Sequence, residues 1–467
     1  MPSTVVESFV WVRSARWPQK EKMPLKRNLG LFEAVGLSVS ILAPTLAMSF
    51  NTIFAVQAAG AAAPLAFLIG TLAMLLVGFC FVAFEKRIGT HGSVYSYIRH
   101  TFGRRWGFAA GWALLFYYSI IFSTCAALFG NGVSVLLGEF GVHQSNWLLL
   151  AIGVSLITGW LTWRDAKIAA RGMLAAEALS IVIVLILVFR ILSTVPFSWV
   201  PLHPDAAHGW SGIGYGMVFA VFSFGGFEGA AILGQETSNP RRNIPVAIIG
   251  TLLFSGLFYI LVVYAQIVGY GIGNIGDLVH SDSPLSSLAE RFISRRFSIC
   301  IDLSIISSTF ACALGSVGAA ARMLRVLSVD GIKPRFADLD PRHNTPTKAI
   351  IGISICNLMG LILLGVHAGA LSYAAATATC GTLALLLVYV GVALAEGVES
   401  MRSRRPLWVG VGILSSLLLL WPLWNNLYPV PTYPANLWPY LVGGWILIGG
   451  IYAWKARSKS SANDVTR

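Results

Sequence analysis

Charged side chains are scarce in this chain of 467 residues. Asp, Glu, Lys and Arg together make up only 11% of it, while hydrophobic residues make up 56%. A soluble globular domain typically has about 25% charged residues, because its surface must face water. So few charges cannot cover a water-facing surface, which excludes an ordinary soluble protein. We expect the outer surface to face the lipid bilayer.

The chain also lacks the patterns that metal sites, disulfide frameworks and enzymes require. None of its six cysteines has the paired spacing of a metal site, and none of its eight histidines has metal-ligand spacing. We therefore expect no metal, no cofactor and no disulfide. A membrane enzyme would need a convergent catalytic set, and a signalling receptor would need a signalling domain. Both are distant alternatives to a transporter, from which substrate-dependent accumulation in sealed vesicles would separate them.

The first 28 residues lack the apolar core of a secretory signal peptide and carry six basic residues. We interpret residues 1–28 as a cytosolic tail whose true start is Met1 or Met23. The net charge of the chain is +13, but its basic residues fall in short gaps between apolar runs. That distribution is typical of membrane orientation and does not indicate nucleic-acid binding.

Long apolar runs take up most of the remaining chain. A membrane-spanning helix needs about 20 mostly apolar residues, and the gaps between the runs leave no room for a soluble domain. Helices satisfy their own backbone groups in lipid, so the sequence predicts an all-α membrane protein with twelve transmembrane helices. The runs cover residues 31–57, 63–84, 107–137, 146–163, 169–193, 212–234, 245–269, 298–325, 348–366, 371–395, 407–424 and 437–454.

The basic residues predict the orientation of these runs. Of the 33 Lys and Arg residues, only Arg190, Arg291, Arg295 and Arg296 fall on the side opposite the N-terminal tail. Cytosolic loops carry an excess of Lys and Arg. We therefore expect an integral protein of the cell membrane, inner or plasma, with both termini in the cytosol.

Two of the predicted spans are interrupted near their middle. Pro44 lies within the first span and cannot keep a full helical hydrogen-bond ladder. Gly225 and Gly226 lie within the sixth, where each lowers helix stability by about 1 kcal/mol relative to alanine. Either interruption alone would be interpreted as a kink or a packing point, because Gly and Pro are common in membrane helices. Their positions five spans apart favour discontinuous helices.

An offset of five spans means that the two interrupted helices cross the membrane in opposite directions. This pattern is typical of a five-plus-five inverted repeat of the leucine-transporter type, with a binding site at mid-membrane. The sequence thus predicts a ten-helix transport core at 29–395 and two further helices at 396–455. The repeats would cover 31–193 and 212–395, and a cytosolic tail would follow at 456–467.

A helix that starts inside the membrane exposes free N–H groups and the positive end of its dipole, which can bind a carboxylate. The carbonyl ends of the opposite half-helices can bind an ammonium group. The interrupted spans therefore predict a site for a small amine-bearing solute such as an amino acid, with Phe222 or Phe224 as a gate. The predicted substrate-binding residues are Ser40, Ile41, Ala43, Pro44 and Thr45, with Phe222, Ser223, Phe224, Gly225 and Gly226.

Three acidic residues interrupt apolar runs: Glu177, Glu228 and Asp302. A carboxylate in a bilayer costs about 2.5–3.5 kcal/mol or more, so its retention indicates function. Glu228 is the leading candidate for a coupling or gating acid, and Glu177 is the second. We expect a structural or outer-gate role for Asp302. Weaker candidates for the side-chain pocket are Tyr117, Tyr118, Ser308, Tyr373 and Thr377.

Around these residues the chain resembles the amino acid–polyamine–organocation permeases. The strongest segment is FSFGGFEGAAILGQETSNPRRNIPVAI at 222–248; HGSVYSYIRHTFGRRWGFAAGW at 91–112 and ARMLRVLSVDGIKP at 321–334 are similar to two loops of the family. The resemblance implies a leucine-transporter-type fold, uptake or exchange of amino acids or polyamines, and a cytosolic gate region at Glu236, Asn239, Pro240, Arg241 and Arg242. Leu42-Ala43-Pro44 departs from the glycine-rich break that is frequent in the family.

The coupling ion is open at this point. We expect a proton more than sodium as the coupling ion, while a sodium symporter and an amino-acid or polyamine exchanger are the alternatives. Ser307 and Ser308 could join carbonyls of the first span around a sodium ion, although small hydroxylated residues also pack helices closely. Which amine is carried, and in what oligomeric state, the sequence leaves open.

Overall fold

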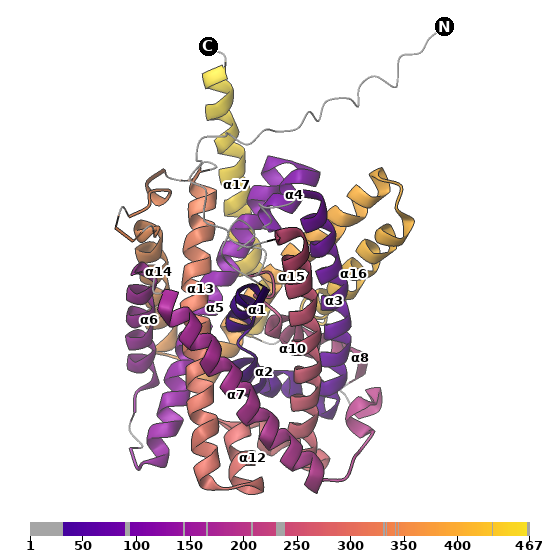
Figure 1. The fold of residues 1–467 in the computed structure, drawn as a ribbon, viewed down its shortest axis with the longest axis vertical. Helices are drawn as coiled ribbons and strands as arrows, with labels where there is room; N and C mark the ends of the chain where they lie inside the picture. The colour runs from indigo at the N-terminus through magenta and orange to yellow at the C-terminus, as the bar shows by residue number, and fades with distance from the viewer. Residues whose placement is uncertain are drawn as a thin grey trace.

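The computed structural model describes residues 31–88, 94–142, 145–164, 167–206, 209–229, 239–329, 332, 334–340, 342–343, 345–431 and 433–464. Within these ranges the chain is all-helical and contains no strand (Figure 1). The long helices are α3 (Ala63–Ile88), α5 (Arg104–Glu139), α6 (Trp147–Trp163), α7 (Lys167–Thr194), α10 (Pro240–Tyr270), α13 (Arg295–Val329), α14 (Thr347–Gly365), α15 (Ala370–Arg402), α16 (Pro406–Asn425) and α17 (Trp438–Asp464).

Shorter elements connect or interrupt these helices. They are α1 (Leu31–Leu42), α2 (Pro44–Ala59), α4 (Val94–Phe102), α8 (Gly209–Ser223), α11 (Ile275–Val279) and α12 (Pro284–Phe292), with the 3₁₀ turns η2 (Gly60–Ala62), η3 (Val200–Leu202), η4 (Pro204–Ala206), η6 (Ile272–Asn274), η7 (Pro334–Phe336) and η8 (Ala435–Leu437).

Nine helical stretches among the described residues are long and apolar enough to cross a membrane. One of them, Pro44–Arg87, contains both α2 and α3, which the turn η2 separates. The apolar helix α6 is shorter, with 17 residues. The prediction of an all-helical membrane protein is thus confirmed, with nine stretches of spanning length in the described ranges where the sequence predicts twelve helices.

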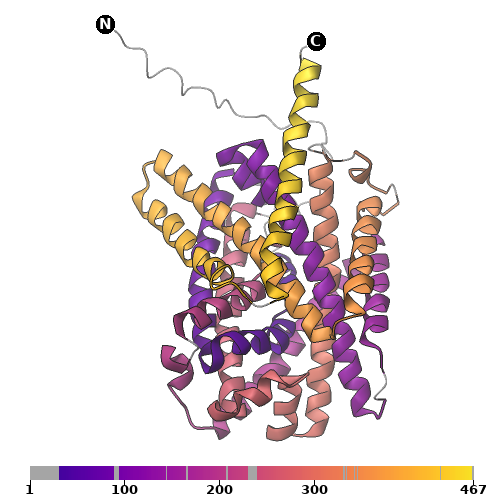
Figure 2. The same cartoon turned by 180° about the vertical axis from the view of Figure 1, so that it is seen from behind.

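The central helix of the bundle is α15. In its most apolar stretch 83% of the residues are buried by protein, against 28% in α16 and 17% in the segment that contains α17. It packs on α3, α4, α5, α8, α16 and α17. Figure 1 shows α1 and α2 near the middle of the bundle, and Figure 2 shows α17 from behind, on the outside of the bundle. The interrupted helices are therefore surrounded by protein.

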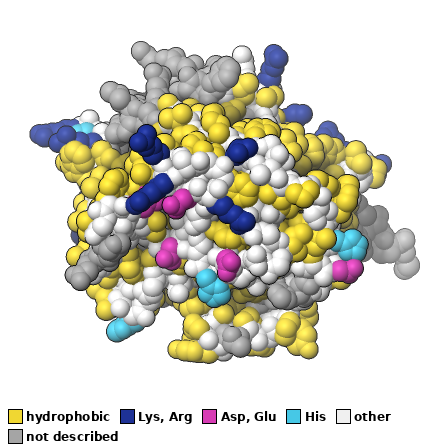
Figure 3. Space-filling view, turned by 90° about the horizontal axis from the view of Figure 1, so that it is seen from below, with side chains coloured by type: hydrophobic (Ala, Val, Ile, Leu, Met, Phe, Trp, Pro, Cys, Tyr) yellow, Lys and Arg dark blue, Asp and Glu magenta, His cyan; other side chains and the backbone are white. Residues whose placement is uncertain are grey.

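Large apolar side chains face outward on the bundle. Leu257, Leu363 and Leu447 are each 70% exposed to the surroundings of the protein. Seen from the end that carries α12, hydrophobic side chains cover much of the rim, and charged side chains gather on the end face, with others at the edge of the view (Figure 3). This is the distribution expected when hydrocarbon surrounds the bundle and water meets its ends.

A buried ion pair joins α3 to α15 where both helices approach one end of the bundle. The Arg87 guanidinium donates to both carboxylate oxygens of Glu396, at 2.9 and 2.8 Å, and also to the Ser400 hydroxyl at 3.1 Å. The Glu396 side chain is fully buried. The bidentate geometry holds α15 against α3.

We expect Arg87→Ala to lower the stability of the folded protein by about 3 kcal/mol, because it leaves the buried Glu396 carboxylate without its partner. The measurement is the thermal unfolding midpoint of the detergent-purified protein. Lys86→Ala, at the exposed neighbouring position, is the control and should leave the midpoint within error. An Arg87→Ala midpoint equal to that of the control would show that the pair does not stabilise the bundle.

Candidate functional site

The first interruption lies between α1 and α2, at Ala43. Its backbone is left-handed, with φ 46° and ψ 66°, and Pro44 is the first residue of α2. Pro44 has no N–H and fits the first turn of a helix, where that donor would be unpaired. Ile41, Ala43, Pro44 and Thr45 are all buried at this break. Ser40 lies in α1, but its side chain is outside the described residues.

The second interruption follows Ser223, the last residue of α8. Turns cover residues 224–228, with Phe224 N–H donating to the Val221 carbonyl at 3.1 Å and Gly225 N–H to the Phe222 carbonyl at 3.0 Å. Gly226 has φ 108°, a conformation that side-chain-bearing residues rarely adopt. Residues 230–238, and with them Glu236, lie outside the described ranges.

The two interruptions touch each other. A Cβ atom on Gly226 would lie 2.3 Å from Ile41 Cγ2, so the turn after α8 packs directly on the end of α1. The Ser38 hydroxyl donates to the Phe227 carbonyl at 3.1 Å, and the Asn51 amide donates to the Ser223 hydroxyl at 2.8 Å. The tertiary structure therefore brings together the residues that the sequence predicts from spans 1 and 6.

Glu177 reaches the break in the first span from α7. Its Oε1 accepts a hydrogen bond from the Thr45 N–H at 3.1 Å, and the side chain is 1% exposed. Next to it, the Leu46 N–H donates to the Ser308 hydroxyl of α13 at 3.1 Å. Glu177 and Ser308 thus lie at the N-terminus of α2, where the helix dipole favours negative charge.

Glu228 lies at the break in the sixth span and accepts three hydrogen bonds. Its Oε1 accepts from the Tyr118 hydroxyl at 2.9 Å, while Oε2 accepts from the Tyr389 hydroxyl at 2.9 Å and from the Gly226 N–H at 3.1 Å. The carboxylate is therefore joined to α5, to α15 and to its own turn. The arrangement holds the shape of the turn and places an ionisable group in the bundle centre.

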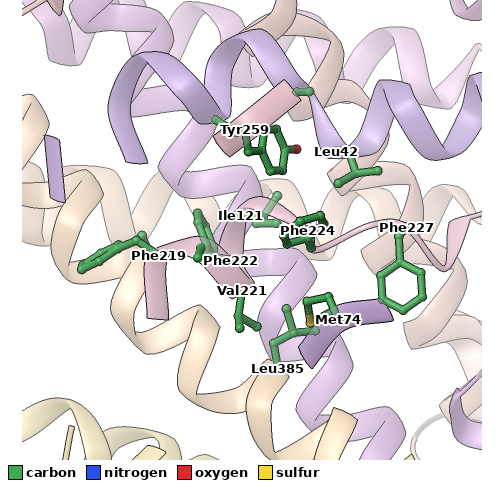
Figure 4. Packing of buried hydrophobic residues seen from close by; sticks show 14 of the residues in the cluster. Leu42, Met74, Ile121, Phe219, Val221, Phe222, Phe224, Phe227, Tyr259 and Leu385 are labelled. Carbon is green, nitrogen blue, oxygen red and sulfur yellow. The ribbon is translucent and has the colours of Figure 1, made fainter. Parts of the chain in front are cut away.

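The aromatic side chains of the second break lie within the packed core (Figure 4). Phe224 packs edge-on against Tyr259 of α10, with ring centroids 5.0 Å apart, and Phe222 packs edge-on against Tyr117 at 6.2 Å. The Tyr117 hydroxyl lies 1.5 Å from the position that a Cβ on Gly225 would take. Only a glycine at 225 permits this approach, which places Tyr117 at the break.

The weaker candidates fall into two groups. Tyr117, Tyr118 and Ser308 lie at the breaks, through the contacts given above. Tyr373 shares a 2.6 Å hydrogen bond with Ser123 and packs against Trp147 at 6.1 Å, in a separate apolar cluster between α5, α6 and α14. The Thr124 hydroxyl donates to Thr377 at 2.9 Å. Tyr373 and Thr377 therefore join α5 to α15 and do not touch the two breaks.

Several residues at the breaks are missing from the set that the sequence predicts. The Tyr259 hydroxyl donates to the Ser223 carbonyl at 2.8 Å, and the Cys312 thiol donates to the Ile41 carbonyl at 3.3 Å. The Gln266 amide donates to the Met48 carbonyl at 3.0 Å and to the Thr52 hydroxyl at 3.1 Å. Gln266 could have been recognised from the sequence, because an amide in the middle of an apolar run needs hydrogen-bond partners. Tyr259 and Cys312 could not, because in an apolar run they resemble ordinary core residues.

Asp302 lies away from the breaks, near the start of α13. Its Oδ1 accepts from Ser283 at 3.2 Å and from Ser286, the residues at the beginning of α12. It therefore fastens α12 to α13, which fits the structural or outer-gate role expected for it. Among the residues that the structure describes, no three His, Cys, Asp or Glu side chains converge as metal ligands.

A cavity of about 300 Å³ lies between α7 and α10, and its lining is apolar. It touches neither break. The lining residues are Leu192, Val195, Phe197, Leu202, Leu257, Ile260, Leu261 and Tyr264.

The chain is similar in sequence to a family of known proteins and to several individual members. A family model described as amino acid permease matches residues 29–451. The methylthioribose transporter of Bacillus subtilis is 27% identical, over 95% of this chain and 96% of the relative. The branched-chain amino acid permease BcaP of the same organism is 24% identical, over 94% and 95%. The low-affinity putrescine importer PlaP of Escherichia coli is 22% identical, over 74% and 76%.

Proposed function

This chain belongs to the amino acid permease family, and from that premise we propose that it carries amino acids or related amines across the membrane by alternating access. The family consists of membrane transporters and not of enzymes. The observation that carries the proposal is the meeting of two helix interruptions in the bundle centre, each next to a buried carboxylate.

For the fold, we propose twelve crossings with a five-plus-five inverted repeat, in which α1–α2 and α8 are the discontinuous helices. Four pairs that such a repeat would relate pack on each other: α2 with α8, α3 with α10, α5 with α13, and α6 with α14. Two interrupted helices in corresponding positions of the halves are the pointer to a mid-membrane site. The remaining divisions at 1–28, 396–455 and 456–467, and the cytosolic placement of both termini, belong to the same proposal.

The substrate-binding residues are proposed to be those that line the two breaks. The direct contact between the breaks supports a substrate-binding role for the backbone groups of Ile41, Ala43, Gly225 and Gly226. The names of the relatives cover methylthioribose, branched-chain amino acids and putrescine. All of these named solutes are small. For this chain, the two buried carboxylates favour a small solute that bears an amine.

Proton coupling is proposed through Glu228 and Glu177. Both are buried, and neither has a Lys or Arg partner among the described residues, so each can exchange a proton as the protein changes state. Sodium symport and substrate exchange are the alternatives. The Ser308 hydroxyl, which a sodium site would use, accepts the Leu46 N–H with one of its two lone pairs.

The test is uptake by purified protein in proteoliposomes with an imposed inward proton gradient and a clamped membrane potential. One proton per solute and a difference of one pH unit allow about tenfold accumulation, because one pH unit equals roughly 1.4 kcal/mol. We expect accumulation to persist when sodium is replaced by choline and to vanish when the proton gradient collapses. Uptake that depends on sodium, or that requires a solute preloaded inside, would replace proton symport by the corresponding alternative.

A further inference from the structure

The N-terminus of α2 offers no free N–H group to a carboxylate of the solute. Pro44 has none, the Thr45 N–H donates to Glu177, and the Leu46 N–H donates to Ser308. The next one, of Ala47, makes the first intrahelical bond, to the Ala43 carbonyl at 2.9 Å. A helix N-terminus is an anion-binding position, and in this chain its own carboxylate, that of Glu177, occupies it.

The second break is used in the same way. The N–H groups of Phe224 and Gly225 donate to carbonyls in the last turn of α8, and that of Phe227 donates to the Phe224 carbonyl. The Gly226 N–H donates to Glu228 Oε2 at 3.1 Å. Each break therefore has a carboxylate of the protein where the carboxylate of an amino acid would be expected to bind.

No lysine or arginine is fully buried in the described part of the chain, where it could hold a second anion. The fully buried charged residues of the described part of the chain are Glu85, Glu177, Glu228, Asp302 and Glu396, and only Glu396 has an arginine partner. A carboxylate brought to the breaks would meet Glu177 and Glu228 at short range without compensation, which like charges oppose in a medium of low dielectric constant.

Three buried oxygen atoms at the breaks lack partners. They are Glu177 Oε2, Thr45 Oγ1 and Tyr117 Oη, on side chains that are each at most 1% exposed. The two hydroxyls can donate or accept, but an ionised Glu177 Oε2 can only accept. A buried acceptor without a donor is costly, so Glu177 Oε2 favours a guest that donates hydrogen bonds. A protonated amine has three hydrogen-bond donors, and its positive charge would supply the cationic partner that Glu177 does not have among the described residues.

We propose that the solute carries a protonated amine and no free carboxylate, and that Glu177 is the residue that sets this specificity. The inference rests on the proposed transport function and narrows its substrate class to carboxylate-free organic cations. Glu177 fills the anion position of α2 through Oε1 and presents Oε2 to the ammonium group, so that an amino acid is rejected by its carboxylate.

Matched pairs of probes that differ only in the carboxylate test the proposal. The pairs are lysine with cadaverine, ornithine with putrescine, and leucine with isoamylamine. Thermal shift of the wild-type protein and uptake into proteoliposomes are measured for both members of each pair. In at least one pair, we expect the amine to bind and to be transported with an apparent affinity at least tenfold higher than that of its amino acid.

The variant Glu177→Gln separates specificity from structure. We expect it to weaken amine binding and to reduce the tenfold preference for the amine to about threefold or less, because the resident charge is gone. Glu85→Gln is the matched control: Glu85 is also buried, but it accepts a hydrogen bond from the Tyr97 hydroxyl and not from a backbone N–H of either break. A purely structural role of Glu177 would lower binding of both members equally and leave their ratio unchanged.

The outcomes separate the inference from the function on which it rests. Transport of the amino acids at affinities equal to or above those of the amines overturns the inference and leaves the transport function standing. An unchanged ratio in a folded Glu177→Gln variant also overturns it. Absence of transport for both members of every pair overturns the proposed amine transport and the inference with it. The wild-type ratio decides the question even where Glu177→Gln fails to fold.

Discussion

Replacement of Gly226 by alanine is expected to abolish transport. The residue has φ 108°, and a Cβ atom would lie 2.3 Å from Ile41 Cγ2, 3.0 Å from Ile41 Cβ and 3.2 Å from the Ile41 carbonyl carbon. The last two atoms belong to the end of α1 and cannot rotate away. Backbone strain and overpacking together should cost roughly 2 kcal/mol or more, and the two breaks would have to separate.

The measurement is initial uptake by equal amounts of folded protein, with the thermal midpoint as a second readout. Gly250→Ala is the control, because Gly250 lies in α10 with open space around its Cα; alanine there should preserve uptake and raise helix stability by up to about 1 kcal/mol. Adding Ile41→Ala to Gly226→Ala removes the nearest atom and should restore part of the activity. Wild-type uptake by Gly226→Ala alone would show that contact between the breaks is dispensable.

Glu228→Gln is expected to eliminate proton-driven uptake while the protein still folds. The carboxylate accepts from Tyr118, Tyr389 and Gly226, and all three are donors. The amide of glutamine has one accepting oxygen and an NH₂ group that can only donate. With the glutamine oxygen on the side of Tyr389 and Gly226, its NH₂ group would face the Tyr118 hydroxyl, which can turn from donor to acceptor. The fold should therefore be kept, but the group could no longer gain or lose a proton.

Uptake with and without the proton gradient is compared for Glu228→Gln, Tyr118→Phe, Tyr389→Phe and wild type. Each phenylalanine variant removes one donor and keeps the carboxylate, so we expect partial uptake that still responds to the gradient. Glu85→Gln is the control for loss of a buried carboxylate elsewhere in the bundle. Gradient-driven accumulation by Glu228→Gln at the wild-type level would remove Glu228 from the coupling mechanism.

The helical architecture could be predicted because it depends on local features, each of which lies within one segment of the sequence. Apolar runs of spanning length predict membrane helices, because the backbone finds no hydrogen-bond partners in hydrocarbon other than its own groups. The long described helices lie on those runs, whereas the short helices α4, α11 and α12 fall between them. Pro44 and the pair Gly225-Gly226 predict the two interruptions because their effects on a helix are local. The structure places the breaks at Ala43 and directly after Ser223, within a few residues of these positions.

The partners of the polar groups at the breaks could not be predicted in the same way. Glu177 could be recognised as a costly acid in a span, but its hydrogen bond to Thr45 joins residues 132 positions apart. Tyr389 and Cys312 had no signal at all, because an aromatic residue or a thiol in an apolar run is usually core. Tyr373 and Thr377 had the right chemistry on the right helix and lie in contacts outside the breaks.

The sequence alone determined that the chain is a helical membrane protein, which of its helices are broken, and that Glu177, Glu228 and Asp302 are buried acids, because these depend on composition and on local backbone chemistry. Only the tertiary structure decided that the two breaks touch and that carboxylates of the chain already hold their free N–H groups. The reason is physical: a hydrogen bond between distant spans depends on how the helices pack and rotate against one another, and no periodicity along the chain records that rotation.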